Sequence, residues 1–149
     1  MSYEGPSTRL EQGADFYVVL PEDGRYQDTV YSGSGYMTAQ AISQALAPYS
    51  NRAFQASAVE PLEEALAKAR QGNFRYLFNT KILHWEDRAT EWSGIPDKIT
   101  LQMEVYDATT GEKLASETSK ASSKWATFGG DHPQDLLPIP AESFVKQLF

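Results

Sequence analysis

The sequence predicts an α/β (α+β) fold: a single mixed sheet of about five to six strands with helices packed on it, in the order β-α-β-α-β-β-β-β-α. Short apolar runs alternate with amphipathic segments in the first half of the chain, which is typical of parallel strands joined by helices. Alternating apolar and polar residues follow in the second half, which indicates an antiparallel meander. The length of 149 residues, with no repeat or linker, is that of one domain.

The first half of the chain supplies three strands and two helices. Residues 15–20 form a short apolar run closed by a proline, which is typical of a buried strand. Apolar residues recur at helical spacing over 37–49 and again over 61–71, where a proline begins the helix and a glycine ends it. We expect further strands at 51–57 and at 74–85, the longest apolar-rich run.

The second half supplies the meander and a last helix. Residues 99–106 alternate strictly between apolar and polar side chains, which predicts a strand with one buried face. Turn residues then lead back into a hairpin partner at 113–118. We expect a further strand at 120–127, a loop containing two glycines, and a C-terminal helix that Pro140 opens.

The connections of a β-α-β-α-β unit have a fixed hand. We therefore expect the helices at 37–49 and 61–71 to pack on one face of the sheet. The polar stretch 1–13 is predicted to be a flexible arm, and 14–149 is predicted to be the single domain. Residues 21–35 are predicted to form a long loop.

Composition excludes several classes of function. A net charge of −7 makes the chain a poor ligand for nucleic-acid phosphates, so no nucleic-acid partner is expected. With no cysteine, the chain has no disulfide, no thiolate metal site and no cysteine nucleophile. No apolar run reaches the roughly 20 residues that span a bilayer. The first residues lack the basic and apolar regions of a signal peptide, as a chain trimmed after its leader also would.

The segment 84–94 concentrates chemically useful side chains. In one interpretation Glu86 and Glu91 are the acid and base of a glycosidase, and Trp85 and Trp92 are platforms for sugar rings. In the other, which we favour, the segment is a structural loop. The tryptophans then cover the end of the sheet, and the arginine of the segment pairs with a neighbouring carboxylate.

A metal site is a further alternative. His84 and Glu86 project to the same face of a predicted strand, and Asp131 and His132 could complete a ligand set. The chain has only two histidines, and they are far apart in sequence. We therefore expect no metal and no cofactor.

A glycine-rich turn precedes the first predicted helix. Free amides at a helix start can hold an anion, but a plain turn with Ser34 near the N-cap is the favoured interpretation, because no lysine follows the glycines. Tyrosines of the same loop and aromatic residues of the loop after the meander could form a binding surface. The candidate binding residues are Tyr26, Tyr31, Ser34, Trp85, Glu86, Arg88, Glu91, Trp92, Trp125 and His132.

Four stretches together, 21–26, 31–35, 84–94 and 125–137, resemble a family of uncharacterised bacterial lipoproteins catalogued as domain of unknown function 4823. The resemblance runs from about Asp15 to the C-terminus, and the segment rich in tryptophan and carboxylates is its specific part. It implies a signal peptide and a lipidated cysteine, neither of which this sequence shows. It implies no established enzyme, so no catalytic residue is carried over. The order of elements is also similar to penicillin-binding-protein activator lipoproteins and the N-terminal domain of TolB.

Three hypotheses follow. The first is a non-enzymatic periplasmic binding or scaffolding domain, anchored to the outer membrane in its full form, whose partner is another envelope protein. Its working surface would be the loops around 26–36, 84–94 and 125–132. The second is an enzyme or binding protein acting on a glycan through Glu86 or Glu91. The third is a structural envelope lipoprotein with no small ligand.

Overall fold

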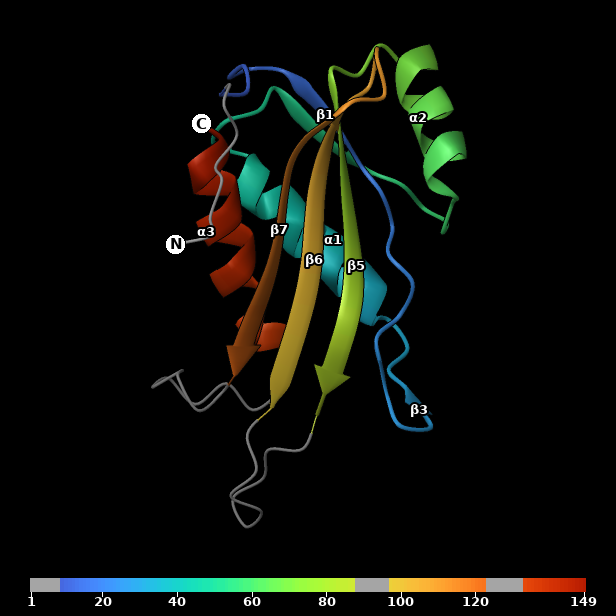
Figure 1. Ribbon diagram of the computed structural model, residues 1–149, viewed down its shortest axis with the longest axis vertical. Helices are drawn as coiled ribbons and strands as arrows, with labels where there is room; N and C mark the ends of the chain where they lie inside the picture. Colours follow the sequence, from blue (N-terminus) through green and yellow to red (C-terminus); the bar gives the residue numbers. More distant parts are fainter. Residues whose placement is uncertain (1–8, 88–96, 123–132) are drawn as a thin grey trace.

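The computed structural model describes residues 9–87, 97–122 and 133–149. Its main sheet has five strands in the order β4-β1-β5-β6-β7 (Figure 1). These strands are β1 (Asp15–Val18), β4 (Arg52–Gln55), β5 (Tyr76–Glu86), β6 (Lys98–Asp107) and β7 (Lys113–Ser122). A small hairpin is formed by β2 (Arg25–Tyr26) and β3 (Thr29–Val30). The helices are α1 (Ser34–Leu46), α2 (Leu62–Gln71), the 3-10 turn η1 (Pro133–Leu136) and α3 (Pro138–Leu148).

The sheet is mixed, as predicted. β1 lies parallel to both β4 and β5, whereas β5, β6 and β7 form an antiparallel meander. Asp107 ends β6, and its Oδ1 accepts hydrogen bonds from the N–H groups of Thr109 and Thr110. Gly111 then takes a φ of 78°, a left-handed conformation that glycine adopts without strain, and the chain returns as β7.

The helices lie on opposite faces of the sheet, so the prediction that 37–49 and 61–71 share one face is wrong. The chain moves from β1 outward to β4 through α1, and then back past β1 to β5 through α2. Two crossovers of the same hand that run in opposite directions place their helices on opposite sides. Alternation along β1 confirms this arrangement, because Phe16 belongs to the α1 side and Tyr17 to the α2 side.

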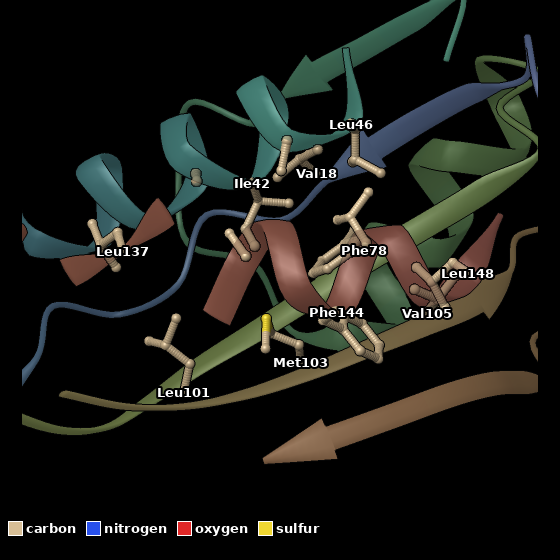
Figure 2. Close-up of a cluster of buried hydrophobic side chains, with 14 of the residues drawn as sticks. Val18, Ile42, Leu46, Phe78, Leu101, Met103, Val105, Leu137, Phe144 and Leu148 are labelled. Atoms are coloured by element: carbon tan, nitrogen blue, oxygen red, sulfur yellow. The ribbon is translucent and has the colours of Figure 1, made fainter. Parts of the chain in front are cut away.

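The larger core fills the space between the sheet and the pair α1 and α3, which lie side by side (Figure 2). Ile42 from α1 and Phe144 from α3 are fully buried there. The ring of Phe144 meets the ring of Phe78 edge-on, with centroids 5.7 Å apart. The main core is therefore contributed by both the first and the last helix of the chain.

A smaller core lies under α2. Ala65, Leu66 and Ala69 face Tyr17 of β1 and Leu77 of β5. Glutamates in the first turn of α2 and basic residues in its last turn suit the helix dipole, as the sequence indicates. Of the strands, α2 packs mainly on β5.

Two boundaries differ from the predictions. β7 runs without a break to Ser122, because it pairs with the ten-residue β6 along its length, so a separate strand beginning at residue 120 is wrong. The rest of that predicted strand, 123–127, lies outside the described residues. The predicted loop 21–35 contains the β2–β3 hairpin and the start of α1, which begins at Ser34 after Gly33 with its φ of 89°.

The start of the described chain is also more ordered than predicted. Leu10 is buried in the larger core, and its N–H donates to the carbonyl oxygen of Leu148. The N–H of Gly13 donates to the carbonyl oxygen of Tyr49. Residues 9–13 are therefore not part of a loose arm, and residues 1–8 lie outside the described residues.

Candidate functional site

The strands β5, β6 and β7 extend beyond β1 and α2, so part of one sheet face has no helix from the described residues on it (Figure 1). The polar side chains there lie in rows across the three strands. We call this surface the open face. Its rows are Lys81, Gln102 and Thr118; His84, Thr100 and Lys120; and Glu86, Lys98 and Ser122. The last of these rows marks what we call the distal end of the sheet.

A β-bulge at Leu83 sets which side chains reach the open face. The pairing register between β5 and β6 shifts between Ile82 and His84, so Leu83 is the extra residue and is 54% exposed. A shift of one residue exchanges the two faces of a strand. Beyond the bulge, His84 therefore lies opposite Thr100 on the open face, whereas Trp85 enters the larger core.

A buried polar network lies where the open face meets α2. Nδ2 of Asn79 donates to Oε1 of Glu104 over 3.1 Å, and the hydroxyl of Tyr106 donates to the same oxygen over 3.2 Å. Nζ of Lys113 lies 3.0 Å from the other carboxylate oxygen. Burial raises the pKa of Glu104, but the hydrogen bonds from Lys113 and Asn79 outweigh it and hold the pKa below its ordinary value.

The network forms part of a cleft of about 760 Å³. One wall is the segment 19–25, and another is the segment 59–62 that leads into α2. Cavities of this size hold small ligands in many proteins. The lining of the cleft is mixed in charge: it has carboxylates from Glu22, Asp23, Glu60 and Glu104 and cations from Arg25 and Lys81.

A second hollow, of about 500 Å³, lies near the distal end of the open face. We call it the lysine hollow, because Lys98 and Lys120 line it from neighbouring strands. The other described residues that line it are Leu83, His84, Ile99, Thr100, Ala121 and Ser122. None of its described lining residues is acidic.

Three of the predicted surface residues, Ser34, Trp85 and Glu86, are buried, and for the first two the structure gives the reason. Oγ of Ser34 accepts a hydrogen bond from the N–H of Gly24 over 2.7 Å, and Ser34 is 1% exposed. A Cβ on Gly24 would lie 2.5 Å from Cβ of Trp85, which is 2% exposed. Ser34, Gly24 and Trp85 therefore form one packed unit that joins the start of α1 to β5, and they do not form a surface.

Tyr26 and His84 bring two of the three predicted surface segments together. Their rings meet edge-on with centroids 5.3 Å apart, so the hairpin lies against the distal part of β5. The N–H of Tyr31 donates to the carbonyl oxygen of Gly24, and Tyr31 packs partly buried against the larger core. Sequence reasoning found these residues but not the contact, because 58 positions separate the two rings along the chain (84 − 26).

Glu86 is almost completely buried at the end of β5. Its Oε1 lies 2.7 Å from Nε2 of His84, so the two side chains share a face as predicted. Of the candidate residues, Arg88, Glu91, Trp92, Trp125 and His132 lie outside the described residues.

Neither a metal cluster nor a membrane-spanning helix is found in the described part of the chain. No three His, Cys, Asp or Glu side chains in 9–87, 97–122 and 133–149 come close enough to hold a metal ion. Asp131 and His132, which the metal alternative requires, lie outside these ranges. No helix within the same ranges is both long and apolar enough to cross a bilayer.

Solved structures share this fold. PelC from Paraburkholderia phytofirmans, a dodecamer, has a TM-score of 0.72 and 20% identity, over 98% of this chain and 93% of PelC. A DUF330 protein from Xanthomonas campestris has a TM-score of 0.59 and 12% identity, over 93% of this chain and 86% of that one. A lipoprotein from Neisseria meningitidis has a TM-score of 0.53 and 14% identity, over 90% of this chain and 96% of that one. At these identities the likeness shows the fold alone.

Sequence comparison places the chain more specifically. No curated protein matches it. Residues 8–148 match the family described as "Domain of unknown function (DUF4823)". This match spans nearly the whole chain and includes the stretches on which the resemblance was based. The chain therefore belongs to the DUF4823 family.

Proposed function

We propose that the chain is a single, non-enzymatic binding or scaffolding domain of a bacterial outer-membrane lipoprotein, and that residues 9–13 belong to this domain. It works on the periplasmic side, and its partner is another envelope protein. The shared fold with a Neisseria meningitidis lipoprotein and with the dodecamer PelC supports this proposal. Family membership is compatible with it, because the family carries no assigned reaction.

The observation that carries the proposal is the packed unit that fixes the hairpin to β5. Gly24 is pressed against Trp85 and hydrogen-bonded to Ser34, so the hairpin beside it is held in one position. The exposed hairpin turn at Gln27 and Asp28 is thereby presented beside the distal end. A rigid platform that presents short segments at one end is a typical arrangement for recognising a protein partner.

The arrangement of Glu86 supports a binding role over a catalytic one. A glycosidase carboxylate must reach a bound sugar, whereas Glu86 is 6% exposed and one of its oxygens is engaged by His84. The glycan hypothesis can be tested directly by assaying hydrolysis. Release of peptidoglycan fragments by the purified protein, abolished in Glu86→Gln, would contradict the non-enzymatic assignment.

The main experiment is site-specific photo-crosslinking of the full-length lipoprotein in its native envelope. A photoreactive residue replaces Asp28 in the hairpin turn, and a matched control replaces exposed Lys146 near the end of α3. We expect a discrete crosslinked partner from position 28 and none from position 146. Equal crosslinking at both positions, or none at position 28, would contradict this working surface. Fractionation of the same cells tests the outer-membrane location.

A further inference from the structure

The lysine hollow offers a second binding site, whose ligand would not be the protein partner. We propose that it binds an oxyanion of the phosphate class, either free or as part of a larger ligand. The hollow has a volume of about 500 Å³, which is ample for such a group. It lies on the open face away from α2, and among the described lining residues it shares only Leu83 with the larger cleft.

The register of the strands places the two lysines together. Lys120 lies opposite Thr100, and Lys98 is two residues from Thr100 on the same face of β6. Diagonal neighbours on adjacent strands stand about 7–8 Å apart, a distance that two lysine side chains easily span. The ammonium groups can therefore converge on one anion, beside Thr100, which is the register partner of Lys120.

Charge explains why an anion fits here. Within the described residues neither Lys98 nor Lys120 makes an ion pair, although the chain has a net charge of −7. Glu86 is the register partner of Lys98, and its Oε1 lies against His84. Two neighbouring cations repel each other, and a bound oxyanion removes that repulsion while accepting hydrogen bonds from both.

The larger cleft lacks this preference. Its lining includes carboxylates from Glu22, Glu60 and Glu104, and Glu104 already holds Lys113. The described lining of the lysine hollow includes no carboxylate. Lys81 lies on the same open face but lines the cleft, so it provides a matched control with the same change of charge.

The test is a titration of the isotope-labelled chain with inorganic phosphate, followed by NMR at constant ionic strength. We expect saturable shifts of the amide signals of Thr100 and Ala121. Lys98→Gln and Lys120→Gln should each weaken binding about fivefold, as expected for one exposed charged contact. Lys81→Gln should leave the affinity unchanged, and amide spectra of all three variants check that they fold.

Two outcomes would overturn the proposal: the absence of saturable shifts, or an equal loss of affinity in Lys81→Gln. A second titration identifies the source of the oxyanion, because Leu83 provides an exposed apolar side chain beside the hollow. A short-chain phosphatidylglycerol that binds more tightly than inorganic phosphate, and loses that advantage in Leu83→Ser, identifies a lipid headgroup. Equal binding of the two probes supports free phosphate or a phosphorylated sugar. The crosslinking at position 28 reports on the protein partner independently.

Discussion

Among the described residues, one face of the sheet is covered by α1 and α3, whereas on the other face α2 covers one end and the rest is open. The same strands serve both faces. On β6, Leu101 and Met103 are fully buried against the helices, and Gln102 between them stands on the open face. This difference indicates that the face covered by α1 and α3 provides most of the stability, whereas the open face is available for binding.

The larger core should show the largest loss of stability. Phe144→Ala removes a fully buried ring that contacts Phe78, and we expect a loss of about 3–5 kcal/mol in the free energy of unfolding. Urea unfolding of the purified chain measures it. A loss below about 1 kcal/mol would mean that the core does not require α3. It would contradict the claim that the face covered by α1 and α3 provides most of the stability.

The smaller core under α2 should be less costly to damage. Leu66 is 8% exposed, in the helical stripe that the sequence predicts, and Leu66→Ala should lose about 2–5 kcal/mol, toward the lower end because this core is smaller. The same urea experiment compares the two variants directly. A greater loss in Leu66→Ala than in Phe144→Ala would reverse the ranking of the faces.

The packed unit of Gly24, Ser34 and Trp85 should show the next largest loss of stability when it is altered. In Gly24→Ala the new Cβ would overlap Cβ of Trp85 and Cγ2 of Ile82, so backbone must shift. Overpacking of this kind costs about 1–3 kcal/mol. Ser34→Ala is the companion variant, because it removes the hydrogen bond from Gly24 without adding volume. If both variants leave the thermal midpoint unchanged, the hairpin is not fixed by this contact.

The sequence predicted what depends on local pattern. Strict alternation over 99–106 identified the β6 side chains that enter the larger core, although Glu104 and Tyr106 on the opposite face are buried as well. Helical spacing over 61–71 identified the buried stripe of α2. It did not predict the faces of the helices. The face on which each helix packs depends on the direction of its crossover, and that direction depends on which strands pair with β1. A local sequence pattern does not predict that pairing.

The candidate site was harder to predict for a related reason. The open face depends on the bulge at Leu83, which exchanges the sides of the strand partway along a continuous apolar run. The network at Glu104 depends on Asn79, which is 25 positions away along the chain. Trp85 was a candidate for the working surface because of the aromatic content of the segment 84–94, yet after the bulge its side chain enters the larger core.

The smallest expected effect concerns the buried network on the open face. Because Glu104 titrates there, this network should make the free energy of unfolding depend on pH. The pKa of Glu104 lies lower in the folded chain than in the unfolded chain, because the hydrogen bonds from Lys113 and Asn79 outweigh the effect of burial. The ionised carboxylate therefore stabilises the fold above its unfolded pKa, and this contribution is lost as the pH falls through the folded pKa. We expect Glu104→Gln to lose about 1 kcal/mol at neutral pH, a modest value because Lys113 is half exposed to solvent.

The decisive measurement is the slope of stability against pH between neutral and acid conditions. It should be flatter in Glu104→Gln than in the wild type, since the variant has no group at this position to titrate. Gln102→Ala, on the same face of β6 but outside the network, is the control and should keep the wild-type slope. A wild-type slope in Glu104→Gln would mean that the network is not formed in solution. The side chains of Asn79, Glu104 and Tyr106, which line the cleft beside α2, would then not be held in place by these hydrogen bonds.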